Sequence, residues 1–166
     1  MNEKFYETAS NLVEEIISNY MELLDFYKEK KQALLTRDRE MLSFVDEKIM
    51  LQVKDIEGIN KKMLEFCKEN ELEMLKVSDL INLANNDKSS FSEVFEKQKV
   101  KINEVSHGLA LVEKANVELI KHGLIMSDKL LDIIISAAVP QKDNYDMHGK
   151  NINTTELGIS SIVEDA

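Results

Sequence analysis

The chain has 166 residues, of which 43% are hydrophobic and 31% charged, with only five glycines and one proline. This length and composition indicate one domain with a real apolar core, and the scarcity of glycine and proline favours an all-helical protein. The formal net charge of −10 argues against nucleic acids and anionic membranes as partners, because binding to either requires clustered lysine and arginine.

The first residues, the apolar stretches and the single cysteine bear on the cellular compartment of the protein. The first residues, MNEKFYETAS, lack a cationic segment followed by an apolar one, so we expect no signal peptide. No stretch has the roughly 18 apolar residues that a membrane span needs. Cys67 is alone, which excludes an intramolecular disulfide and a cysteine-based zinc site. We therefore expect a cytoplasmic protein without membrane insertion.

Four helices are predicted from the apolar spacing, near residues 3–35, 38–68, 71–85 and 90–138. Asp38 is suited to capping the second helix, and Asn70 marks a break after it. Ser90, followed three residues later by Glu93, fits a capping box at the start of the last helix. Pro140 ends that helix, because its ring cannot continue one.

An apolar heptad pattern runs along the last predicted helix. Its positions are Gln98, Ile102, Val105, Leu109, Val112, Asn116, Leu119, Gly123, Met126, Leu130, Ile133 and Ala137. No proline interrupts them, so they predict one helix of about 45 residues. The second helix has a similar row, Leu42, Val45, Ile49, Gln52, Ile56, Ile59, Met63 and Phe66. Together the two rows predict an elongated antiparallel helical bundle of long, coiled-coil-like helices.

Some positions in these rows are not apolar. Gln52, Gln98 and Asn116 are expected to cost stability while fixing the register of the helices. Gly123 weakens its helix by about 1 kcal/mol relative to alanine. It would let another backbone approach closely, or let the end of the helix bend.

The end of the last helix is apolar on nearly every side, at Leu130, Leu131, Ile133, Ile134, Ile135, Ala137, Ala138 and Val139. A bundle helix needs one apolar stripe, about a third of its circumference. Two interpretations are open. This end is buried between neighbouring helices, or it is covered by a partner chain, a second copy or the protein's own tail.

The domain organisation follows from these patterns. Residues 1–139 are predicted to form the helical bundle, with a partner-binding end near 120–139, and residues 140–166 a flexible polar tail. The tail ends in a small apolar cluster, Leu157, Ile159, Ile162 and Val163. The tail either covers the apolar end of the last helix or is a disordered terminus that adds solubility.

Candidate chemistry is sparse. Glu104 and His107 have the Glu-x-x-His spacing of di-iron bundles, but no second pair exists. His107 and His122 are expected to be exposed or partly buried helix histidines rather than phosphoacceptors, and Cys67 is expected to be a packed side chain. We therefore expect no catalytic residue, no metal and no cofactor, and hence a protein that is not an enzyme.

Residues 23–51 and the C-terminal region carry a family resemblance. Leu23-Leu24, Lys31-Gln32-Ala33-Leu34, Asp38, Leu42, Lys48 and Leu51 resemble the N-terminal signature of the FlgN family of flagellar export chaperones. Tyr145-Asp146-Met147-His148-Gly149 resembles the Tyr-x-x-x-Gly element that follows the last helix in that family. Residues 151–166 extend beyond the expected pattern.

The resemblance implies a cytoplasmic chaperone that binds the C-terminal helices of hook-associated proteins, prevents their premature assembly and delivers them to the flagellar type III export gate. It places export-gate docking at Tyr145. The client surface is then expected at the apolar residues Leu124, Met126, Leu131, Ile134, Ile135 and Val139. Homodimerisation stays open.

Two other classes of function remain open. One is a structural coiled-coil or oligomerising protein whose apolar rows are satisfied by its own copies. The other is a helical phosphotransfer or metal-binding bundle built around His107 or His122.

Overall fold

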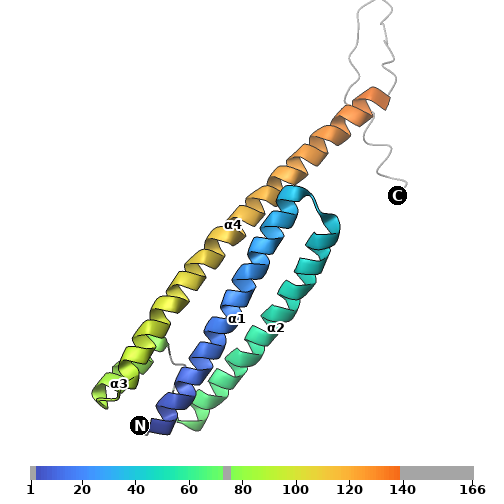
Figure 1. Cartoon of the computed structure of the whole chain (residues 1–166). Coiled ribbons are helices and arrows are strands. Elements are labelled where there is room, and N and C mark those ends of the chain that lie inside the picture. Colours follow the sequence, from blue (N-terminus) through green and yellow to red (C-terminus); the bar gives the residue numbers. More distant parts are fainter. Residues whose placement is uncertain (1–2, 73–75, 139–166) are drawn as a thin grey trace, which may run out of the picture. The chain divides into compact units, whose positions relative to one another are not determined.

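The computed structural model describes residues 3–72 and 76–138, which form four α-helices: α1 (Glu3–Thr36), α2 (Arg39–Glu69), α3 (Val77–Asn86) and α4 (Phe91–Ala138) (Figure 1). These residues contain no strand. The predicted all-α helical class is therefore confirmed, as is the single long helix, since α4 runs for 48 residues. The chain divides into two compact units, Met1–Gly123 and Leu124–Ala166.

The turn between α1 and α2 follows the predicted position. Arg37 adopts a left-handed backbone conformation with φ of 56°, and the amide of Asp38 donates to the carbonyl of Ala33 at 3.0 Å. The Asp38 carboxylate then accepts from the amide of Met41 at 2.9 Å. This is the N-cap expected of Asp38, because a side-chain oxygen satisfies one of the free amides of the first helical turn.

Two helix starts differ from the prediction. The third helix begins at Val77 rather than near residue 71, after a C-cap at Asn70 whose amide donates to Cys67 and Lys68 carbonyls. At the start of α4, the amide of Phe91 donates to the Ser89 hydroxyl at 3.4 Å. Ser89, the residue before the predicted Ser90, thus supplies the hydroxyl that accepts from the first amide of this helix.

Within the first unit, α1 is the central helix, with α2 and α4 beside it (Figure 1). The α1–α2 pairs run in opposite order, from Lys30–Asp46 to Glu15–Lys62, so these helices are antiparallel. The α1–α4 pairs run in the same order, from Ser10–Gln98 to Tyr27–Asn116, so these two helices are parallel. Helices α1 and α4 therefore run in one direction, and α2 runs in the opposite direction.

The hydrophobic core cluster lies where α1 and α4 begin and α2 ends. Its buried members are Phe5, Tyr6, Ala9, Val13, Ile17, Phe66, Leu80, Ala84 and Phe95. The short helix α3 contributes Leu80 and Ala84, which are almost wholly buried. The rings of Phe5 and Phe66 stack with centroids 5.0 Å apart. We call this cluster the aromatic base of the bundle.

Candidate functional site

The last part of α4 exposes a concentration of large apolar side chains. Between 42% and 65% of each of the following is exposed: Leu124, Ile125, Met126, Leu130, Leu131, Ile133, Ile134 and Ile135. We call this set the apolar end of α4. Large contiguous apolar patches are rare on soluble monomers and mark sites of interaction.

The register of the bundle explains where this exposure begins. Hydrogen bonds join α1 and α4 at sequence separations of 88 and 89 residues. Because α1 ends at Thr36, it offers partners to α4 only as far as about Gly123. The heptad pattern continues beyond that residue, but α1 does not. The described side chains of the apolar end of α4 are accordingly exposed.

Most of the residues expected from their apolar character to bind a client belong to this surface. Leu124, Met126, Leu131, Ile134 and Ile135 are all exposed. Val139 and the proposed export-gate residue Tyr145 lie outside the described residues, as do the tail residues Leu157, Ile159, Ile162 and Val163. Ile125, Leu130 and Ile133 were not among the expected client residues and also belong to the surface.

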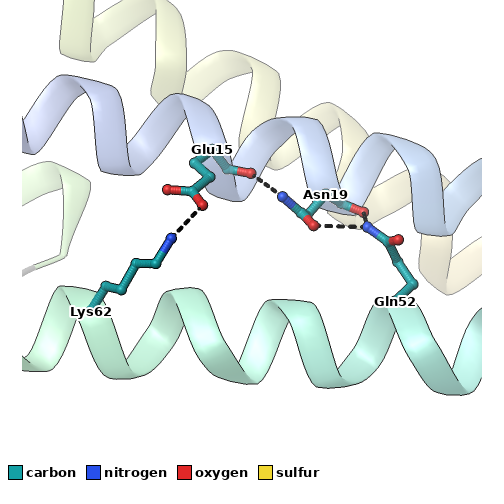
Figure 2. Close-up of polar contacts among 4 residues, drawn as sticks. All are labelled: Glu15, Asn19, Gln52 and Lys62. Atoms are coloured by element: carbon teal, nitrogen blue, oxygen red, sulfur yellow. Dashed lines mark hydrogen bonds and ion pairs between the residues drawn. The ribbon is translucent and has the colours of Figure 1, made fainter.

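The predicted register residues are buried and hydrogen-bonded. Figure 2 shows Gln52 of α2 reaching α1, where its side-chain amide donates to the Asn19 carbonyl at 3.1 Å and to the Asn19 side-chain oxygen at 2.9 Å. Asn19 in turn donates to the carbonyl of Glu15 at 2.8 Å, and Glu15 pairs with Lys62 at 2.7 Å. These bonds hold one register, because sliding the helices would leave a buried amide unpaired.

Gln98 and Asn116 have the same role between α4 and α1. The Gln98 amide donates to the carbonyl and hydroxyl of Ser10, and the Asn116 amide donates to the carbonyl of Tyr27. The side-chain oxygens of both residues are buried without a hydrogen-bond partner in the described structure. Both residues therefore fix the register of α4 against α1 at a cost in stability, as their place in the apolar row predicts.

One polar contact at the aromatic base was not anticipated. The Tyr6 hydroxyl is buried and donates to the Asp87 carboxylate at 2.7 Å. Burial, the hydrogen bond to Asp87 and the charge of that carboxylate together raise the pKa of Tyr6 to about 12. The contact ties the start of α1 to the end of α3 across 81 residues of sequence, and local patterns carry no signal for it.

The turn end of the α1–α2 hairpin carries a second, smaller apolar region. The Lys48 ammonium lies 4.5 Å from the centroid of the Phe44 ring and 5.1 Å from that of Phe26. Phe44 and Leu51 are nevertheless more than half exposed. Lys48 thus covers part of an aromatic surface by a cation–π contact, which shields it from water.

The residues considered above as candidates for chemistry are exposed or dispersed. Glu104, His107 and His122 are exposed on α4, and no cluster of three histidine, cysteine, aspartate or glutamate side chains could hold a metal in this part of the chain. A cavity of about 400 Å³ on the α1–α2 surface is lined by Glu15, Asn19, Lys54, Asp55, Gly58, Ile59 and Lys62. Its Glu15 and Lys62 pair with each other, which neutralises both charges.

No described helix contains a stretch long and apolar enough to cross a membrane. Comparison with protein-family models, with curated protein sequences and with solved structures found no match for the chain.

Proposed function

We propose that this protein is a chaperone that binds amphipathic helices of a client protein, and that its client is a hook-associated protein destined for flagellar type III export. The proposal depends above all on the exposed apolar end of α4. A surface of this kind supports binding to an amphipathic helix, which would bury its own apolar face against these side chains. The resemblance to the FlgN family supplies the identity of the client.

In this proposal the first unit is the scaffold. Its core is formed by α1, α2, α3 and the first part of α4, so the apolar end of α4 remains available for a partner. A client held there in the cytoplasm would be kept from premature assembly until it reaches the export gate. Tyr145 is proposed as the docking residue for that gate, by the same resemblance.

Two substitutions test the client surface in the full-length chain. Leu131→Asp and Ile134→Asp should each weaken binding of the C-terminal helical segment of a hook-associated protein by at least a hundredfold. A carboxylate buried without a partner costs several kcal/mol, and each 1.4 kcal/mol is a factor of ten. Binding is measured by titration calorimetry, and folding by circular dichroism.

Ser136→Asp is the matched control, because it adds the same charge to the same part of α4 at a position that is not one of the residues of the apolar end. It should bind the client normally. Normal binding by either apolar variant, or loss of the folded bundle in both, would show that these side chains are not an accessible client surface.

The alternative function is self-association. Light scattering on the protein alone distinguishes the two. A monomer that forms a complex when the client segment is added supports the chaperone. A dimer that Ile134→Asp converts to a monomer, with no response to the client segment, would establish a structural coiled-coil protein instead.

A further inference from the structure

The apolar end of α4 covers more of the helix circumference than one partner helix requires. At 100° per residue, its apolar positions fill an arc of roughly 200°, from Ile133 at one edge to Ile135 at the other. A helix packed against one neighbour needs a stripe of about 100°. Asp128, Lys129 and Asp132 lie in the remaining arc, together with Ser136 and the single apolar residue Ile125.

This arc consists of two rows. The first row is Met126, Leu130 and Ile133, and the second is Leu124, Leu131 and Ile135. The centres of the two rows lie roughly 150° apart around the helix, and Ile134 lies between them. One straight helix cannot contact both rows along its length.

The two rows have different relations to the bundle. The first row continues the heptad positions whose earlier members, including Gln98 and Asn116, pack on α1. The second row continues the side of α4 that carries Val117 and Ile120, which stay 42% and 41% exposed although α1 is present. A helix that took the place of α1 on the first row would therefore leave the second row uncovered.

We propose that the apolar end of α4 binds two helices of one partner protein at the same time, one on each row, as a helical hairpin. This inference rests on the proposed function, which it makes more specific. The bundle itself contains the precedent: α1 packs on α2 through Asn19 and on α4 through Ser10 and Tyr27, each on a different side.

Charge favours a different protein over a second copy as the occupant. Each chain has a net charge of −10, so two copies repel one another. Asp128 and Asp132 border the second row, whereas Lys121, on the same side, already pairs with Glu118 at 3.4 Å. The helix on the second row is therefore one with lysine or arginine beside its apolar stripe.

Stoichiometry tests this inference without the natural client. The probes are a designed four-heptad amphipathic helix, with leucine at its core positions and lysine beside them, and a hairpin of two such helices joined by a short loop. Sedimentation and calorimetry on the full-length protein should give two single helices per chain but one hairpin per chain. The hairpin should bind at least tenfold more tightly, because its second contact is intramolecular.

Paired substitutions assign the rows. Leu130→Asp with Ile133→Asp disables the first row, and Leu131→Asp with Ile135→Asp disables the second. Each pair should reduce the number of bound single helices from two to one and weaken hairpin binding at least tenfold, while Ser136→Asp changes neither. All these positions lie outside the Met1–Gly123 unit, and circular dichroism checks that each variant is folded.

Several results would overturn the two-row inference: saturation at one single helix per chain, no binding of either probe, loss of all binding when one row is disabled, or a dimer of the protein that excludes both probes. Failure of the hook-associated segment to bind, with two designed helices still bound, would instead reject only the flagellar client.

Discussion

The aromatic base and the apolar end of α4 have similar side chains and opposite surroundings. Phe95 at the base is fully buried, whereas 65% of Ile133 is exposed, although both lie on the same helix. The difference comes from the neighbours, because α1 and α3 cover the base and α1 ends at Thr36. Heptad spacing therefore identifies side chains that would be stabilised by burial against another helix. The lengths of the other helices decide which of these side chains are buried.

The largest expected effect on stability comes from a substitution in the aromatic base. Phe95→Ala should lower the free energy of unfolding by about 3–5 kcal/mol, because it removes a fully buried ring and leaves a cavity. Ile133→Ala, at the apolar end, should change it by no more than about 0.5 kcal/mol. Chemical denaturation followed by circular dichroism measures both. A loss above 2 kcal/mol for Ile133→Ala would mean that this side chain is buried in solution.

A smaller loss of stability is expected when the hydroxyl of Tyr6, in the aromatic base, is removed. Tyr6→Phe should cost about 1.5 kcal/mol at neutral pH, because a hydrogen bond to a carboxylate is lost. The raised pKa of Tyr6 adds a pH signature. Its stabilising contribution is complete below pH 10 and is lost as the pH rises to about 12, since the unfolded phenol ionises first.

Denaturation at several pH values measures this signature. The wild-type protein should lose more stability between pH 10 and 12 than the Tyr6→Phe variant does. Lysine deprotonation affects both proteins equally, so the difference between them reports Tyr6. Identical pH profiles would place the hydroxyl in contact with water.

The smallest effect compares two glycines of α4. A Cβ at Gly123 would meet nothing within 4 Å, so Gly123→Ala should strengthen the helix by up to about 1 kcal/mol. A Cβ at Gly108 would lie 3.2 Å from a methyl carbon of Leu24, so Gly108→Ala should gain less or nothing. Amide hydrogen exchange on α4 distinguishes them. Equal gains would mean that Leu24 moves away at no cost.

Much of the bundle was predictable from local pattern. The rows led by Leu42 and Gln98 predicted two long helices, and the polar residues within those rows are the ones that bond across helices. Asp38 caps α2 as its residue type predicts. The heptad rows and the cap depend on residues within one or two turns of each other, which the sequence displays directly.

The rest depended on partners far away in the chain. Gly123 was expected to allow either a close approach or a bend, whereas the close neighbour is at Gly108, facing Leu24. The contact between Tyr6 and Asp87 joins residues that no periodicity relates. Leu130 and Ile133 have the same heptad spacing as buried positions of α4, so the spacing alone does not reveal that they are exposed. Their exposure follows from the end of α1 at Thr36.

The burial of Cys67 gives the protein an internal reporter. It is the single cysteine of the chain, and only 2% of it is exposed. A thiol reagent can react with it only when the helices around it separate, so the labelling rate measures the frequency of that opening. Every substitution described above can therefore be ranked by its effect on the motion of the native bundle, without any denaturant and without introducing a dye site.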